Sequence, residues 1–153
     1  MIKIYGILFS QQEDKLGESI SLQGTTMIDN MPILTSSKNL IGRMTEYQFV
    51  YKAIANDSAE LAIKSGLAKD YLVDKDESNG PDYLELKYPF CKIKGVLVEN
   101  SFLREAIRLG NLCFGIEGIV KERNGNLITS CVIDHVVVGM MSEVSPTKIY
   151  LDE

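Results

Sequence analysis

The sequence predicts a β-dominated α+β fold, a partly closed antiparallel β-barrel that carries two helices. Apolar and polar residues alternate in several segments, most clearly over Cys91–Leu97. An Asn-Gly pair at 124–125 separates two long apolar segments, as in a β-hairpin. Only two stretches have helical spacing. Strands joined by short turns close readily into a barrel, and 153 residues suffice for a single domain, 1–153, with its own core.

Composition and charge argue against two classes of partner. The chain is 45% hydrophobic and 24% charged, which is typical of a soluble globular domain. The net charge is -5 and the basic residues form no run, so nucleic acid is not expected as a direct ligand. No apolar stretch approaches the roughly 20 residues of a membrane span, and the strand-like start at Ile2 lacks the apolar run of a signal peptide. We therefore expect no membrane partner and a location inside the cell that makes the protein.

The cysteines indicate neither disulfides nor a metal site. Cys91, Cys113 and Cys131 lie in apolar, strand-like segments, where cysteine behaves as a small hydrophobic residue. They are odd in number, form no C-x-x-C pair and are accompanied by a single histidine. The sequence thus predicts reduced, buried thiols and no metal or cofactor.

The N-terminal third is predicted to be mostly extended. Gly6 is a candidate bulge within the first strand, and Asp29, Asn30 and Pro32 mark a turn. The residues between positions 37 and 47 are assigned to a loop. The predicted strands are, in order, Ile2–Phe9, 20–24, 31–37 and Tyr47–Ile54.

The first predicted helix follows these strands. Asp57 or Ser58 is a suitable N-cap, and the helix is expected to continue over 58–73, although Gly66 should weaken or divide it. Its apolar stripe consists of Leu61, Ala62, Leu67 and Tyr71. A polar loop over 74–82 then leads into two further strands, 83–90 and 91–100.

The second helix and the strand after it, Phe102–Val120, form the centre of the prediction. Asn100 or Ser101 caps the helix 102–109, and Gly110 ends it. Ala106, Ile107 and Leu109 are its predicted core side. In the strand Leu112–Lys121, the side chains expected to face a core are Leu112, Phe114, Ile116 and Ile119. Gly115 and Gly118 in this strand indicate a close backbone approach, a bulge or a lost side chain.

The C-terminal part is predicted to return through the hairpin turn as the strand Leu127–Met140, followed by a tail with a turn at Pro146. Open barrels leave edges that must be covered, and Met140 is an adaptable side chain. We therefore expect Met140 to Leu151 to make intermolecular contacts, in a homo-oligomer or with another protein. The alternative is that the tail folds back over its own barrel.

Residue chemistry alone does not predict an enzyme. His135 is the single histidine, and the adjacent Asp134 should face the opposite side of the strand, so the two should not act together. Glu117 could act as an acid or base, but spacing places no partner beside it. Ser36 and Ser37 precede a lysine, and a serine–lysine nucleophile is chemically possible, although such a cluster is typical of a solvated loop. No phosphate-binding glycine loop occurs.

Four stretches, in this order, resemble parts of the prohead (capsid-maturation) serine proteases of tailed phages, which share the barrel of the herpesvirus assembly proteases. Residues 4–20, IYGILFSQQEDKLGESI, are similar to the opening strand and acidic turn. Residues 31–42, MPILTSSKNLIG, are similar to a strand and loop that end in a histidine and an Ile-Gly pair. Residues 106–125, AIRLGNLCFGIEGIVKERNG, resemble the helix, glycine and nucleophile strand. Residues 131–147, CVIDHVVVGMMSEVSPT, resemble the closing strand.

The resemblance implies a prohead-protease-like barrel and a phage-head setting. The implied partners are a capsid, portal or scaffold protein, and the implied location is the host cytoplasm or the virion. The family's nucleophilic serine falls on Gly115, and its histidine falls on or next to Ser37. Attack by serine needs a hydroxyl, a base and an oxyanion donor, and the first two are missing at these positions. The resemblance therefore argues against the peptidase reaction.

Three functions remain open at this point. The preferred one is a degenerate relative of the protease that serves as a structural or assembly component of the head or virion. The second is an active capsid-maturation serine peptidase with a relocated site, for which Ser36, Ser37 and His135 are weak candidates. The third is an unrelated small cytosolic β-barrel that acts as a binding module. Whether Glu153 is a native or a processed C-terminus is also open.

Overall fold

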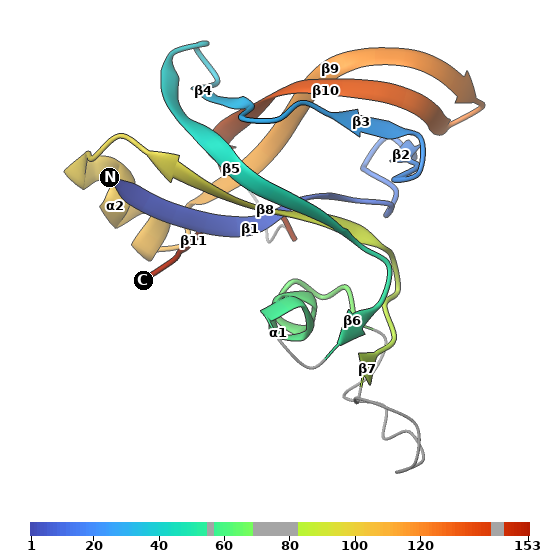
Figure 1. Cartoon of the computed structure of the whole chain (residues 1–153), viewed down its shortest axis with the longest axis horizontal. Helices are drawn as coiled ribbons and strands as arrows, with labels where there is room; N and C mark the ends of the chain where they lie inside the picture. Colours follow the sequence, from blue (N-terminus) through green and yellow to red (C-terminus); the bar gives the residue numbers. More distant parts are fainter. Residues whose placement is uncertain (55–56, 69–82, 142–145) are drawn as a thin grey trace.

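Strands make up 54% of the structure, and its largest sheet curls into an open half-barrel (Figure 1). The computed structural model describes residues 1–54, 57–68, 83–141 and 146–153. A strand-dominated fold with two helices is thus confirmed for the described residues. The elements are β1 Ile2–Ser10, β2 Ser19–Ile20, β3 Thr25–Met27, β4 Pro32–Thr35, β5 Leu40–Val50, β6 Ala53–Ile54, α1 Asp57–Lys64, β7 Tyr83–Leu84, β8 Phe90–Leu97, α2 Ser101–Arg108, β9 Leu112–Asn124, β10 Leu127–Met140 and β11 Tyr150–Leu151.

The large sheet is mixed. Its order is β11-β1-β8-β5-β4-β10-β2, and β3 and β9 also pair with β10. The neighbours are antiparallel except along one edge of β10, where β2, β3 and β4 run parallel to it. The expectation of an antiparallel barrel is wrong for these three strands. No hairpin fixes their direction, since Thr25 on β3 and its partner Cys131 on β10 are 106 residues apart.

The C-terminal tail folds back over its own sheet. The Phe114 amide donates to the Thr147 carbonyl, and the Ile149 amide donates to the Leu112 carbonyl at 3.0 Å. Beyond them, β11 pairs with β1, and Ile149 is fully buried. Residues 147–151 therefore fold back over the chain's own sheet, as the second of the two predicted arrangements has it. Met140 is 73% exposed, and an intermolecular contact through it stays a prediction.

Helix α2 has the predicted N-cap and the predicted glycine after it, but each end lies one residue earlier than predicted and its buried face differs. The Asn100 side chain accepts hydrogen bonds from the Phe102 and Leu103 amides, and Gly110 follows the helix with a φ of 75°. Its core contacts come from Leu103, Ala106 and Ile107, which share one face at i, i+3 and i+4 spacing. Leu109 is 58% exposed, so its predicted core position is wrong. As the C-cap residue it lies on the other side of the helix.

Helix α1 is shorter than predicted. It begins at Asp57, ends at Lys64 and is followed by Gly66 with a φ of 72°. Phe90 joins this helix to the sheet in a second apolar cluster, whose buried members are Ile7, Val50, Ala59, Leu61, Ala62, Leu67 and Phe90. The predicted helical residues 69–73, with Tyr71, and the loop over 74–82 lie outside the described residues.

Several strand boundaries differ from the prediction, and the predicted strand 20–24 is replaced by the end of β2 at Ile20 and the start of β3 at Thr25. β5 begins at Leu40 rather than Tyr47 and ends at Val50. Its early start was not predicted because a bulge at Thr45, in the pairing with β8, interrupts the apolar alternation. The predicted strand 83–90 is reduced to β7, since Phe90 already belongs to β8. The bulge of β1 lies between Ile7 and Phe9 instead of at Gly6.

The hairpin of β9 and β10 has the predicted partners, but its two-residue turn is Gly125 and Asn126 rather than the predicted Asn124 and Gly125, because Asn124 still pairs with Leu127. Leu112 and Phe114 are buried and Ile116 is half-buried. Ile119 is 62% exposed, so its predicted core position is wrong. The turn end of the hairpin lies beside β2 (Figure 1), which pairs with Leu127 and Ile128 of β10.

The three cysteines differ in burial. Cys91 and Cys131 are buried, Cys113 is partly buried, and all three are free. Burial raises the pKa of the Cys91 thiol to about 12, so this thiol is unreactive at neutral pH. Neither described helix has the length and apolar character that crossing a membrane requires.

Candidate functional site

Four side chains that the sequence could not connect form a histidine cluster, consisting of Lys38, Glu117, Asp134 and His135. His135 Nδ1 lies 2.5 Å from Asp134 Oδ1, and its Nε2 lies 3.0 Å from Glu117 Oε2. The Lys38 ammonium, from the turn between β4 and β5, donates a hydrogen bond to the same Glu117 oxygen. The imidazole is the most buried member, while the other three are about half exposed. The cluster thus links β9, β10 and a turn far away in the sequence.

A β-bulge explains the contact between Asp134 and His135. Ile133 pairs with Gly118 and His135 pairs with Glu117, so Asp134 is an extra residue on β10. A bulge re-aims side chains that would alternate in a regular strand. The prediction that Asp134 and His135 face opposite sides and cannot act together is therefore wrong.

The cluster is poorly suited to proton transfer. Hydrogen bonding by the Lys38 ammonium, aided by its charge and by His135, lowers the pKa of the Glu117 carboxyl. A carboxylate with a lowered pKa is a weak general base near neutral pH. Both ring nitrogens of His135 face carboxylate oxygens, so neither is directed at an open position for a substrate hydroxyl. No hydroxyl contacts this ring within the part of the chain that the structure describes.

The lowered pKa of Glu117 gives a direct test of the cluster. Lys38→Ala should raise this pKa toward its ordinary value, measured as the midpoint of the Glu117 carboxyl ¹³C signal in an NMR titration. Because the folded-state pKa is depressed, the contact stabilises the fold at neutral pH, and this contribution is lost as the pH falls through that pKa. The contribution should be small and sensitive to salt, since the groups are exposed.

Lys3→Ala is the matched control for this titration. Lys3 lies on an exposed part of β1 and does not contribute to the lowered pKa of Glu117, so the Glu117 midpoint should not move. Equal Glu117 midpoints in the wild type and in Lys38→Ala would contradict the assigned cause.

Gly115 and the Ser36–Ser37 turn lie on neighbouring parts of this surface. Gly115 is opposite Val137, which is opposite Leu34 on β4. Two strand spacings, about 10 Å, therefore separate Gly115 from Leu34. Both serines are exposed in the turn that follows β4. Lys38 of that turn reaches Glu117, two residues after Gly115.

Crowding by neighbouring atoms does not explain why position 115 is a glycine. A Cβ at this position would meet only the Val137 carbonyl oxygen at 3.8 Å and the Val137 Cβ at 3.9 Å, which are ordinary contacts. Neither Phe49 nor Tyr51 lies within 4 Å of this Cβ position. Gly118 is different, because a Cβ there would lie 1.9 Å from the Val132 carbonyl oxygen. Only Gly118 fulfils the prediction of close backbone approach.

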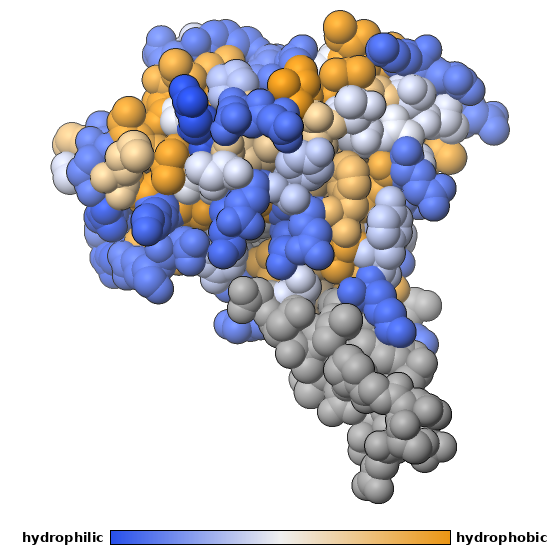
Figure 2. Space-filling model, viewed as in Figure 1, coloured by the Kyte–Doolittle hydropathy of each residue, from blue (hydrophilic) through white to orange (hydrophobic). Residues whose placement is uncertain are grey.

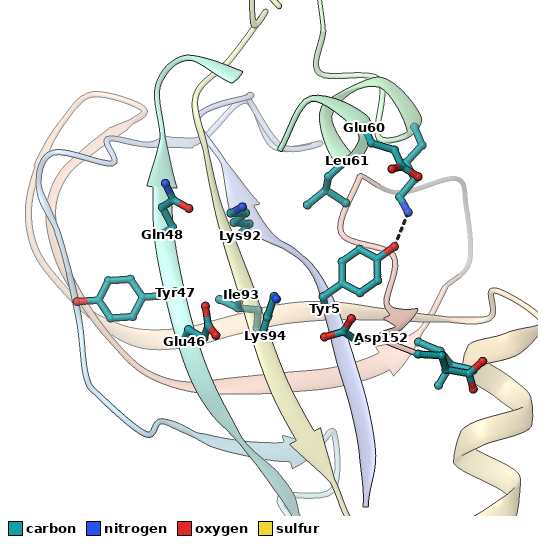
Figure 3. Close-up of a pocket in the computed structure, with 13 residues that line it drawn as sticks. Tyr5, Glu46, Tyr47, Gln48, Glu60, Leu61, Lys92, Ile93, Lys94 and Asp152 are labelled. Carbon is teal, nitrogen blue, oxygen red and sulfur yellow. Dashed lines mark hydrogen bonds between the residues drawn. The ribbon is translucent and has the colours of Figure 1, made fainter. Parts of the chain in front are cut away.

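A second candidate site is a groove of about 400 Å³ between α1 and the outer face of β1, β5 and β8 (Figure 3). The pairing register aligns Tyr5, Lys94 and Glu46 in one row across the three strands, with Lys92 and Gln48 in the next row. Figure 3 shows the Tyr47 ring pointing away from these side chains. The remaining lining residues are Glu60, Leu61, Lys64, Ile93, Leu151, Asp152 and Glu153.

Lysines are held in fixed positions along this groove. Lys64 Nζ donates to the Tyr5 hydroxyl at 2.7 Å and lies 3.7 Å from the centre of the Tyr150 ring. Lys92 Nζ donates to the Ser58 hydroxyl at 2.8 Å. Together with Lys94, they face carboxylates of β5, α1 and the C-terminal residues. The groove therefore carries both signs of charge, which suits a polypeptide better than a simple anion or cation.

Sequence reasoning missed the groove because its walls come from five separate segments of the chain. The one available signal was the alternation of Lys92 and Lys94 with buried residues on β8, which predicts a solvent-facing cationic row. No group of three or more His, Cys, Asp or Glu side chains among the described residues is placed to hold a metal ion.

Comparison with protein-family models, with curated proteins and with solved structures found no match to this chain.

Proposed function

We propose that this chain is a non-catalytic assembly component of a tailed-phage head, derived from a prohead protease. The observation that carries the proposal is the surface around Gly115. The resemblance assigns the nucleophile to this position, which has space for a side chain but no hydroxyl. The nearby Glu117 and His135 are engaged with each other and with Lys38 and Asp134.

The geometry does not favour a relocated serine nucleophile. A serine–lysine mechanism needs a neutral amine that accepts the serine proton, usually in a desolvated pocket. The Lys38 side chain is 55% exposed and donates to the Glu117 carboxylate. Ser36 and Ser37 are themselves exposed in an open turn. A solvated ammonium of this kind is not a base for either hydroxyl.

Binding is the role for which the described surface is equipped. The groove beside α1 is concave, its charged side chains are positioned by strands, and it carries both signs of charge. In the proposed role it would hold a segment of a capsid, portal or scaffold protein in the host cytoplasm, and the chain could remain in the virion.

Co-assembly tests this proposal. The tagged chain is expressed with the capsid, portal and scaffold proteins of its own genome, and heads are separated by sedimentation. We expect the chain to sediment with heads or to co-purify with one of these three proteins. The double variant Lys92→Glu/Lys94→Glu should lose most of this association. Lys3→Glu, on an exposed part of β1 outside the groove, should keep it.

A folded chain that associates with none of these proteins would contradict the head-assembly role and favour a free-standing binding module. Equal association of the groove variant and the Lys3→Glu control would contradict the groove as the contact surface.

A further inference from the structure

The outer edge of β9 is largely unpaired. One edge of this strand pairs with β10 along its whole length. On the other edge, the hydrogen bonds to the described part of the tail involve Leu112 and Phe114 alone. From Gly115 to Asn124, no described segment hydrogen-bonds to this edge. Unpaired strand edges are templates for pairing with another strand unless charges or bulges block them.

The unpaired part of β9 is apolar at its centre. Ile119 and Val120 are 62% and 45% exposed, and they point to opposite faces of the hairpin. Figure 2 shows hydrophobic surface over this hairpin, with hydrophilic residues at its tip. Between Gly115 and Val120 the only charged residue is Glu117, so few charges oppose the pairing of this edge with another strand.

The order of charges along β9 is complementary to itself in the antiparallel direction. We propose that two copies of this chain pair through their β9 edges about a two-fold axis at Ile119. In this register Ile119 faces Ile119 of the second copy, and each Glu117 lies opposite the β9 bulge at Lys121 of the other copy. A parallel arrangement in register would instead place like charges together. A two-fold interface of this kind closes on itself and gives a dimer.

The unpaired backbone N–H and C=O groups of β9 agree with this register. Leu112 and Phe114 direct their backbone groups to the outer edge, where they bond to the tail. Alternation then directs the backbone groups of Gly118 and Val120 to the same edge, and those of Ile119 toward β10. Gly118 and Val120 of the second copy can thus exchange hydrogen bonds across the axis. Both described contacts of Glu117 use Oε2, which leaves Oε1 for Lys121 of the second copy.

Cysteine cross-linking tests the register in the full chain. The background is Cys113→Ser, because the other two native thiols are buried. In the proposed dimer, the two copies of Ile119 form a non-hydrogen-bonded pair whose Cα atoms lie about 4.5 Å apart, which is within the range of a disulfide. Ile119→Cys should therefore give a covalent dimer under mild oxidation. Lys121→Cys alone should not, because its two copies lie about 13 Å apart. A mixture of Glu117→Cys and Lys121→Cys chains should cross-link.

Light scattering on the unmodified chain should show a concentration-dependent dimer. Lys121→Glu should weaken it about tenfold, because it replaces two opposite-charge pairs by two like-charge pairs. A monomer at every concentration would overturn the proposal. So would a Lys121→Cys chain that cross-links as readily as Ile119→Cys, or a dimer that cross-links only through Met140→Cys. None of these results depends on a role in phage heads.

Discussion

Phe90→Ala is expected to lower the free energy of unfolding by about 3–5 kcal/mol, a large part of the stability of a typical domain. Phe90 is fully buried and is among the largest side chains of the core. It lies where β8 meets α1, in the cluster with Ile7, Val50 and Leu61. Removing its ring leaves a cavity that the sheet cannot close, since its neighbours on three strands are fixed by hydrogen bonds.

Urea denaturation followed by circular dichroism measures this change. The matched control is Phe102→Ala, because the Phe102 ring is 85% exposed at the start of α2. Its effect should stay within about 0.5 kcal/mol of the wild type. Similar losses for the two variants would contradict the assigned core.

Gly118→Ala is expected to be the second most damaging change, with a loss of about 2–3 kcal/mol. Its new methyl group would overlap the Val132 carbonyl oxygen, which belongs to the backbone of β10 and cannot rotate away. Gly115→Ala on the same strand has open space. It should be neutral or stabilise by about 0.4–1 kcal/mol, because alanine restricts the unfolded chain.

Comparing Gly118→Ala with Gly115→Ala separates the effect of atomic overlap on stability from the general effect of replacing a glycine in a strand. Neither position has a positive φ, so backbone strain does not contribute to the difference. Both unfolding curves are measured under the same conditions. If Gly115→Ala lost as much stability as Gly118→Ala, Gly115 would have a packing role, and the assignment of its surface as an open site would be wrong.

Local sequence signals predicted the parts of the fold that depend on local physics. The β9–β10 hairpin was found from the Asn-Gly pair at 124–125, although its turn is Gly125 and Asn126, and α2 follows from Asn100 and Gly110. The start of β5 was missed because the bulge at Thr45 breaks its alternation. The parallel pairing of β10 with β2, β3 and β4 was missed because no local signal connects segments so far apart.

The candidate site was predictable as single residues and not as an arrangement. His135, Glu117 and Gly115 were each identified from the sequence. Their assembly depends on the extra residue Asp134 and on the contact from Lys38 to Glu117, which spans 79 residues. A bulge changes the direction of a side chain without leaving a reliable signature in the residues themselves.

The proposed absence of a serine nucleophile is tested most directly by the intact mass of the wild-type chain after treatment with excess fluorophosphonate. We predict an unchanged mass, under conditions that fully modify a control serine hydrolase, and no cleavage of general protein substrates. The reason is that no described hydroxyl has a base beside it at Gly115 or in the Ser36–Ser37 turn. An adduct that disappears in Ser36→Ala or Ser37→Ala would contradict the non-catalytic role and identify a relocated nucleophile.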